Sequence, residues 1–198
     1  LHGALTQLNA DLDNQEIEKI GVMVHRAMSM QQRSFHTPEH IFDLSTSDDP
    51  HSTLAALFHD IVYYQVDNGF LDEITEILAP YIEIRDDGVY TRQDISATDR
   101  AFHGCAVVFG FSTGQLLPPF GGLNEFLSAL VMDVLLVGNV ADVDLMIATA
   151  CIEETIPFRG PNEAGDAPPV ILERRIRTAT DTFGLGLSDG EIRNAVIS

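Results

Sequence analysis

Apolar residues recur at helical spacing along almost the whole chain, and this periodicity constrains the fold more than any other feature of the sequence. They fall three and four residues apart, as in Ile17, Ile20 and Val24, which places them on one face of an α-helix. A short helix is also expected to begin at Thr37, where Pro38 follows a residue that favours the N-cap. The other predicted helices cover about residues 14–32, 50–64, 71–82, 99–109, 124–138, 142–157 and 170–183.

Helix start and stop signals support these ranges. Asp13 and Glu16 have the spacing of a capping box, in which each residue satisfies a backbone N–H of the other. Asn124 and Asp142 stand before apolar stretches and are expected to act as N-caps. Gly138 follows an apolar stretch, at the place where helices often end in a left-handed residue.

One domain is the organisation that the sequence favours, because the chain has no internal repeat and no linker long enough to divide domains. We expect an all-α fold, a helical bundle over residues 1–198, with its core in about 14–160 and further helices in 170–198. The chain starts without Met and stops soon after Ser188 and Glu191 open a new helix, so we expect the native chain to be longer.

The chain is strongly acidic, with 11 Lys and Arg against 30 Asp and Glu and a formal net charge of −19. Such a protein lacks the clustered basic residues that bind a phosphate backbone, and anionic lipid repels it. Its 45% of hydrophobic residues argues against disorder. We therefore expect neither long nucleic acid nor a membrane among its partners, and the oligomeric state stays open.

Two cysteines, Cys105 and Cys151, lie in apolar surroundings and are expected to be small buried thiols. Because they form no disulfide framework, a reducing compartment such as the cytoplasm is expected. No signal-peptide pattern is present at the start. No apolar run reaches the ~18 residues that a membrane span needs.

His59 and Asp60 are two adjacent ionisable residues that follow four apolar ones. Neighbouring positions on a helix point about 100° apart, so both can be buried only if their charges are compensated. A divalent cation would do this, because imidazole and carboxylate are both good ligands. The alternative is a core histidine with its hydrogen bonds satisfied, beside a capping aspartate.

Asp133 is a third ionisable residue in an apolar context, inside the most apolar predicted helix. A buried unpaired carboxylate is costly, and a metal ion or an Arg partner removes the cost. Asp142 and Asp144 are the alternatives, although both look like first-turn residues that favour the helix dipole. His59, Asp60 and Asp133 are predicted to form one metal site with a histidine from the segment before residue 41. Its ligands are His36, His59, Asp60 and Asp133.

The ordered set His, His-Asp, Asp on a helical scaffold resembles the HD superfamily of metal-dependent phosphohydrolases. Within it, the chain is most similar to the group of predicted metal-dependent HD phosphohydrolases. That group carries an Arg-x-[Tyr/Phe]-His-x-x-x-His segment and then an Ala-x-x-Phe-His-Asp-x-x-Tyr segment, which here are Arg33–His40 and Ala55–Tyr63. Asp133–Gly138 matches a later Asp-x-x-Leu-x-Gly segment loosely. The resemblance covers about residues 20–160.

The resemblance implies a bundle of the HD-domain type and an enzyme that cleaves a small phosphate ester or nucleotide. The four predicted ligands would bind one divalent ion, which members of the superfamily select from manganese, iron, cobalt, nickel and zinc. The ion would polarise a phosphoryl oxygen and lower the pKa of a bound water. Asp60 would be the catalytic residue that holds and deprotonates this water.

Substrate binding is expected from residues near these ligands. Arg33 is the nearest cation by sequence, although a surface ion pair explains it equally well. His40 competes with His36 as the first ligand and is otherwise a substrate-binding or surface histidine. Glu153 and Arg159 lie around a predicted helix end, as does Glu154, and are expected to line a pocket or to form a solvated helix terminus.

Two other functions fit the same residues. A scaffold that binds a nucleotide or a protein partner as a sensor would keep a structural or vestigial metal site. A metal-dependent oxygenase would require a second metal centre, and the sequence has no convincing further set of histidines. Pocket shape is expected to depend on the Gly- and Pro-rich loops 112–122 and 157–169, which carry no motif that identifies a substrate.

Overall fold

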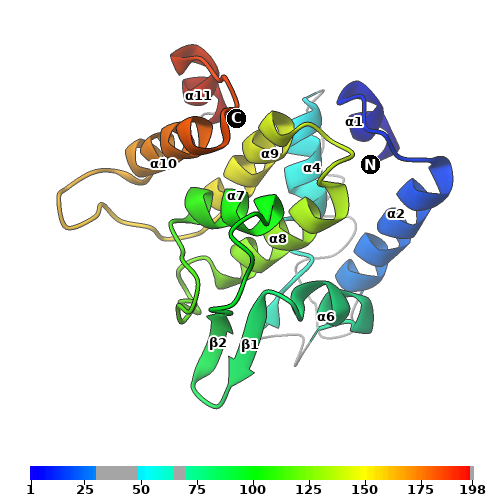
Figure 1. Cartoon of the computed structure of the whole chain (residues 1–198), viewed down its shortest axis with the longest axis horizontal. Coiled ribbons are helices and arrows are strands. Elements are labelled where there is room, and N and C mark those ends of the chain that lie inside the picture. Colours follow the sequence, from blue (N-terminus) through cyan, green and yellow to red (C-terminus); the bar gives the residue numbers. More distant parts are fainter. Residues whose placement is uncertain (30–48, 65–69, 197–198) are drawn as a thin grey trace.

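The computed structural model describes residues 1–29, 49–64 and 70–196, and these form nine helices and one two-stranded sheet (Figure 1). The helices are α1 (His2–Gln7), α2 (Asn14–Met28), α4 (Pro50–Phe58), α6 (Asp72–Leu78), α7 (Arg100–Phe109), α8 (Leu123–Leu136), α9 (Asp142–Glu154), α10 (Pro168–Phe183) and α11 (Asp189–Ala195). The strands are β1 (Ile82–Arg85) and β2 (Gly88–Thr91). The expectation of a mostly helical protein is confirmed. The helix predicted at Thr37 lies outside the described residues.

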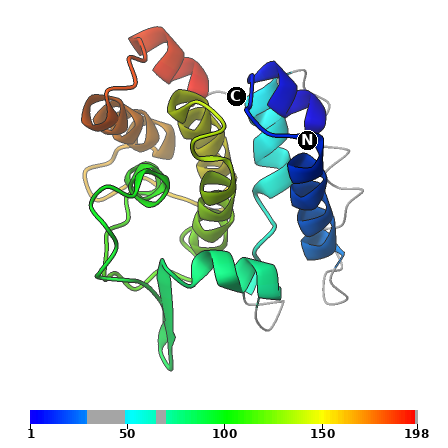
Figure 2. The same cartoon turned by 45° about the vertical axis from the view of Figure 1, so that its right-hand side comes forward.

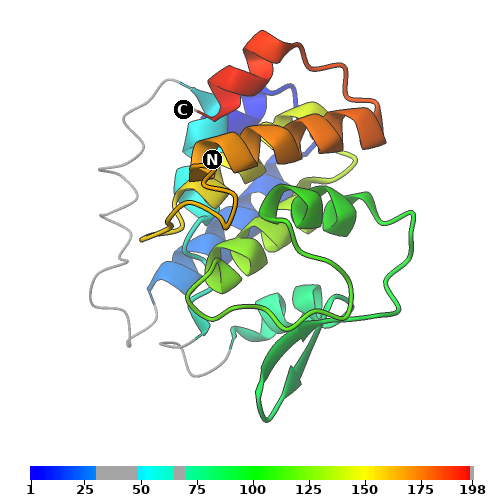
Figure 3. The ribbon, with the colours of Figure 1, turned by 90° about the vertical axis from the view of Figure 1, so that its left-hand side faces the viewer.

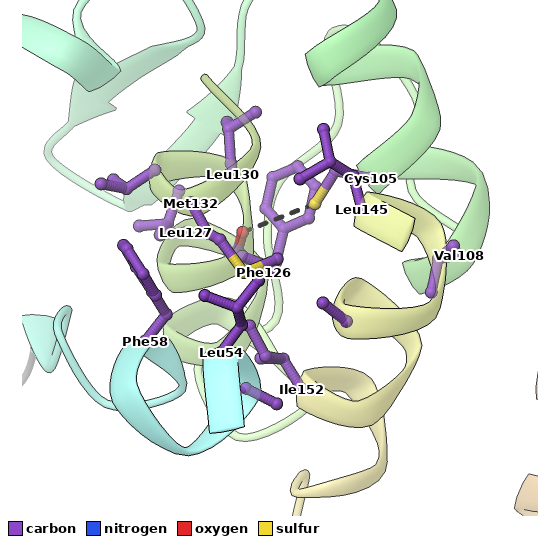
Figure 4. Close-up of a cluster of buried hydrophobic side chains, with 14 of the residues drawn as sticks. Leu54, Phe58, Cys105, Val108, Phe126, Leu127, Leu130, Met132, Leu145 and Ile152 are labelled. Atoms are coloured by element: carbon purple, nitrogen blue, oxygen red, sulfur yellow. Dashed lines mark hydrogen bonds between the residues drawn. The ribbon is translucent and has the colours of Figure 1, made fainter. Parts of the chain in front are cut away.

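Helix α8 is the centre of the fold, because it buries side chains on nearly every face. Helices α4, α6, α7 and α9 all pack against it. Figure 4 shows the part of this core where α4, α7, α8 and α9 meet. There the thiol of Cys105 donates a weak hydrogen bond to the carbonyl of Phe126 at 3.8 Å. Cys105 and Cys151 are both free and buried, as the sequence predicts.

The remaining helices wrap this centre. Helix α9 packs against α4, α10 crosses α7 and α9, and α1 packs against α4. All three ribbon views place α11 at one end of the molecule and the β-hairpin at the other (Figures 1, 2 and 3). One connected cluster of buried hydrophobic side chains takes residues from all nine of these helices and from both strands. None of the described helices has the length and apolarity that crossing a bilayer requires.

Capping bonds confirm several predicted helix ends. The amide of Glu16 donates to Asp13 Oδ1 and the amide of Asp13 donates to Glu16 Oε2, both at 2.8 Å, so the capping box at the start of α2 is formed. The same reciprocal bonds join Ser188 and Glu191 before α11. Gly138, after α8, has a φ of 83°, in the left-handed region that ends helices.

Two predicted N-caps are wrong by one or two residues. Helix α8 begins after Gly122, which has a φ of 102°, in the left-handed region. The N-terminus of this helix has no side-chain cap. Asn124 lies inside the helix and binds the backbone of a distant residue instead. Asp142 is the first residue of α9 rather than its cap, which is Ala141.

The prediction of an all-α fold is corrected by the hairpin of β1 and β2. Helix α6 ends at Leu78, and Pro80 cannot donate the backbone bond that a longer helix needs. Strands β1 and β2 then pair in antiparallel fashion, from Ile82 opposite Thr91 to Arg85 opposite Gly88. Asp86 and Asp87 connect the two strands. Four-residue strands are too short to show alternation clearly, and the loop 112–122 supports them from outside. The hydroxyl of Thr91 donates to the carbonyl of Ser112 at 2.6 Å.

Candidate active site around His59 and Asp60

His59 and Asp60 lie directly after α4, in the turn that ends this helix. The helix begins as predicted, because the amide of Ser52 donates to Asp49 Oδ2 at 2.7 Å and Pro50 occupies the first turn. It ends at Phe58, not at residue 64. Although both are ionisable, His59 and Asp60 are each only 8% exposed.

Two side chains of α8 hold the segment that follows this turn. The amide of Val62 donates to Ser128 Oγ at 3.0 Å, and the amide of Tyr64 donates to Asn124 Oδ1 at 3.0 Å. These bonds satisfy N–H groups that a longer helix would have paired within itself. They explain why the predicted helix stops early, and they fix the His59 turn against the centre of the fold.

The imidazole of His59 is oriented by two contacts. Its Nδ1–H donates to the carbonyl of Ala56 at 3.0 Å, and its Nε2 lies 2.8 Å from Asp60 Oδ2. Burial opposes a positive charge on the ring, but the hydrogen bond and the charge of Asp60 outweigh it, so the pKa of His59 is raised above 6.5. The ring and the carboxylate therefore form one buried, polar unit.

A hollow of about 280 Å³ opens beside His59, between α4 and α9. Cys151 and Glu154 line its α9 side. Burial and the neighbouring charge of Glu153 raise the pKa of Glu154 to about 7, against a smaller opposite effect of Arg159. Burial also raises the pKa of the Cys151 thiol to about 12, so this cysteine is not a nucleophile at neutral pH. Glu154 is thus an acid in this hollow that changes protonation near neutral pH, and it shares the hollow with His59.

Glu153 forms a buried ionic cluster behind the hollow. It is 1% exposed, and its Oε1 accepts hydrogen bonds from Arg159 and, at 3.2 Å, from Arg175. Within the described ranges, its Oε2 has no hydrogen-bond partner. Burial raises the pKa of Glu153, although both guanidinium groups oppose this shift. Glu153 and Arg159 lie around the end of α9, as expected, and are bonded to each other. A solvated terminus does not describe the buried Glu153, and the substrate-binding role of both residues stays a prediction.

Glu125, in the first turn of α8, connects the His59 turn with Arg159. Burial raises its pKa, the charge of Asp60 adds to this, and the charges of His59 and Arg159 act in the opposite direction. The carboxyl of Glu125 therefore lies within electrostatic reach of all three residues. It also lines a second hollow of about 490 Å³.

Asp133 does not join this group. Its carboxylate lies between α8 and α9, where Thr149 Oγ1 donates to it, and it borders a small hollow of about 30 Å³. Burial raises the pKa of Asp133 well above its usual value, with the Thr149 bond opposing and Asp142 adding to the shift. Arg100 lines the same hollow but is paired with Asp142. The assignment of Asp133 as a metal ligand gains no support from the described residues.

The other predicted ligand and two substrate residues cannot be placed. Arg33, His36 and His40 lie outside the described residues, and their roles stay predictions. Across the described ranges, no three His, Cys, Asp or Glu side chains stand where they could hold one metal ion together. His59, Asp60 and Asp133 therefore do not form such a group of three.

His59 and Asp60 nevertheless have the chemistry of metal ligands. A histidine that binds a metal through one nitrogen usually donates its other N–H to a carbonyl or carboxylate, as His59 Nδ1 does to Ala56. Its Nε2 lies 2.8 Å from Asp60 Oδ2, which is the length of a charge-assisted hydrogen bond, so the ring would have to lose the proton between the two atoms before both bound one ion. Imidazole and carboxylate together would supply part of the ligand set of a divalent ion.

Two residues of this region, Glu125 and Phe120, belong to no motif of the sequence. Glu125 looks like an ordinary first-turn acid that favours a helix dipole, and only the packing of α8 against the His59 turn gives it another environment. Phe120 belongs to a loop that was expected to shape a pocket, but its residue type was not singled out. The signal was available, because Pro119-Phe120-Gly121 and Pro157-Phe158 place aromatic rings in turn-forming sequences.

Comparison of the chain with protein-family models, with curated proteins and with solved structures found no match. The resemblance to the HD superfamily therefore stays a prediction. A functional proposal depends on the chemistry of the residues themselves.

Proposed function

We propose that this protein is a metal-dependent phosphohydrolase that cleaves a small phosphate ester, with its site at His59 and Asp60. One observation carries the proposal: two adjacent ionisable residues are buried together, with their polar atoms facing each other and a hollow open beside them. Buried ionisable groups with specific charge partners in a hollow are concentrated at functional sites. The motif Ala55–Tyr63, quoted above, supports the same reaction class.

Each residue of the pair has a role in this proposal. His59 and Asp60 would hold a divalent ion, which supplies a Lewis acid and lowers the pKa of a bound water. The carbonyl of Ala56 fixes the ring of His59 so that Nε2 faces Asp60. Asp60 accepts the proton of the attacking water at its carboxylate. The bonds of Ser128 and Asn124 to the following segment keep this turn in place.

Arg159 is the cation proposed to contact the phosphate. Its guanidinium has five N–H donors, and Glu153 occupies the side that faces the interior. Arg159 also acts on the charges of Glu125 and Glu154, which places it near both hollows. A net charge of −19 repels anions at long range, so the substrate is small and is held close to the positive groups.

Metal analysis and a phosphoester panel test the proposal directly. Protein purified without added metal is expected to contain a divalent transition metal, and to hydrolyse at least one ester with Mn, Co, Ni, Zn or Mg. His59→Ala and Asp60→Ala are expected to lose the metal and at least about 100-fold in kcat/KM. His25→Ala, exposed on α2, is the control and is expected to keep both. Melting curves by circular dichroism separate loss of activity from loss of fold.

Protein that carries no metal under any condition and turns over no phosphoester rules this function out. A binding protein without turnover is then the second candidate, because the described residues bring no third ligand to His59 and Asp60. A nucleotide or protein partner that raises Tm without being consumed would identify it.

A further inference from the structure

Phe120 and Phe158 are exposed aromatic residues that line the same hollow. Their exposed fractions are 93% and 105%, the largest among the large hydrophobic residues of the described chain. They come from different loops, the first before α8 and the second after α9. Both border the hollow of about 490 Å³ that Glu125 also lines. Single exposed apolar residues are common on protein surfaces, but here two of them border one hollow.

The backbone holds both rings in these positions. The amide of Gly121 donates to the carbonyl of Pro118 at 3.1 Å, so Phe120 occupies the third position of a tight turn. Phe158 has a φ of 58°, in the left-handed region that bulky residues rarely adopt. The next residue, Arg159, is bonded to the buried Glu153. This bond anchors one side of the loop in the interior while the ring of Phe158 stays outside.

The hollow combines apolar walls with the polar residues Tyr63, Asn124 and Glu125. Pro119 and Pro157 lie in its wall next to the two rings, and the carboxyl of Glu125 is its acidic group. A carboxylate accepts hydrogen bonds and donates none, so it selects a ligand edge that carries N–H groups. The volume is in the range of about 300–1,000 Å³ that small-molecule sites occupy. Through Glu125 the hollow adjoins the His59 turn.

We propose that this hollow binds a flat heteroaromatic ring with N–H groups on its edge, held between the faces of Phe120 and Phe158 and bonded to Glu125. The ring is the non-reacting part of the substrate, so the link to catalysis rests on the phosphohydrolase proposed above. Stacking on aromatic side chains accepts any flat ring, and the contact with Glu125 then selects among them. A long acidic polymer is disfavoured, because the negative charge of the protein repels it.

The absence of tryptophan from the sequence makes binding directly measurable. Phe158→Trp places a single tryptophan at the hollow and keeps an aromatic face there. Adenosine, which has an amino-substituted ring and no phosphate, is expected to quench its fluorescence in a saturable way, and ribose is expected to have no effect. Ile84→Trp, 54% exposed on the hairpin, is the control and is expected to show no saturable quenching.

Two double variants, each carrying Phe158→Trp and one further substitution, test whether the ring of Phe120 contributes to binding. Adding Phe120→Ala is expected to raise the Kd for adenosine at least about tenfold, the usual effect of losing one stacking partner. Adding Val170→Ala, which removes an exposed apolar residue of α10, is expected to leave the Kd unchanged. Equal quenching in the Ile84→Trp protein, or no effect of Phe120→Ala, overturns the proposal.

The failure of this proposal is distinguishable from that of the proposed function. Adenosine binding needs neither metal nor turnover, so it tests the hollow alone, while metal content and ester hydrolysis test His59 and Asp60. If both proposals hold, Phe120→Ala raises KM for adenosine monophosphate and leaves KM for glycerol phosphate unchanged. If adenosine does not bind and Phe120→Ala instead turns a dimer into a monomer in sedimentation, the rings form a self-association surface and the proposal is wrong.

Discussion

The hydroxyl of Thr149 lies 3.0 and 3.2 Å from the two carboxylate oxygens of Asp133, at the contact of α9 with α8. Asp133 is 5% exposed and Thr149 is 1% exposed. Burial raises the pKa of Asp133 well above its usual value, although the hydrogen bond from Thr149 opposes this shift. An aspartic acid that is buried and bonded to a threonine in this way is a packing element between two helices.

Asp133→Asn is therefore expected to change little. An amide has nearly the shape of a carboxyl group, and its oxygen still accepts the hydrogen bond from Thr149, so the free energy of unfolding at neutral pH should stay within about 1 kcal/mol of the parent protein. Metal content should be unchanged. Chemical denaturation and elemental analysis measure the two quantities. Loss of the metal in a folded Asp133→Asn protein would restore Asp133 as a ligand, as first predicted from the sequence.

Glu153 anchors Arg159 and Arg175 from a buried position, so its removal is expected to be costly. Glu153→Ala leaves two partly buried guanidinium groups without their carboxylate and should lower the free energy of unfolding by about 3–5 kcal/mol. Glu83→Ala breaks the exposed pair with Arg85, whose N···O distance is 2.9 Å, and should cost much less, because solvent screens a surface ion pair. Urea denaturation of both variants makes the comparison. Similar losses would show that the Glu153 cluster is no more than a surface ion pair.

Much of the helical architecture could be predicted from the sequence, because the 3.6-residue period and the capping residues are local signals. Asp13 with Glu16 and Ser188 with Glu191 act where their spacing places them. The hairpin pairs within residues 82–91, around Asp86-Asp87-Gly88, but its four-residue strands give a weaker periodic signal than the helices do. Its strands are also held by the bond from Thr91 to Ser112 and by other contacts with a loop more than 20 residues away, which no short window contains.

A residue of the candidate site could be predicted from the sequence only where an ionisable side chain stands in an apolar, buried stretch. His59 and Asp60 are outliers in an apolar stretch and lie together, as adjacent residues must. Asp133 also stands in an apolar stretch, but its angular position around the axis of α8 decides which neighbouring element its side chain faces. It is five residues after Ser128, which is about 140° around α8. Ser128 faces the His59 turn, so Asp133 faces α9.

Ser128→Ala is expected to loosen the His59 turn. The hydroxyl accepts the amide of Val62 at 3.0 Å in a buried position, and alanine leaves that amide without its acceptor. The free energy of unfolding should fall by about 1–3 kcal/mol. If the turn is the active site, kcat falls in the folded variant as well. Ser96→Ala, exposed before α7, is the control for loss of a serine hydroxyl. An unchanged kcat and stability would show that this bond does not position the site.

Glu154 gives the protein a pH-dependent stability whose sign is opposite to that of an ordinary salt-bridged acid. Burial, with the adjacent Glu153, raises its pKa from 4.5 to about 7 in the folded protein. Below about pH 4.5 the carboxyl is protonated in both states. Between about pH 4.5 and 7 the unfolded chain releases the proton that the folded protein keeps, so the unfolded state binds fewer protons and stability falls as pH rises.

Glu154→Gln removes this dependence, because glutamine does not ionise. Relative to the parent protein, the variant is expected to gain about 1 kcal/mol between about pH 4 and pH 8, a value reduced because the side chain is partly exposed and solvent screens it. Urea denaturation across this range measures the difference, and Glu18→Gln on the exposed face of α2 is the matched control. Above about pH 7 the two curves should run parallel, since Glu154 is then ionised in both states. A difference that grows as pH falls would mean that Glu154 is stabilised as a carboxylate, and that Arg159 outweighs burial at this position.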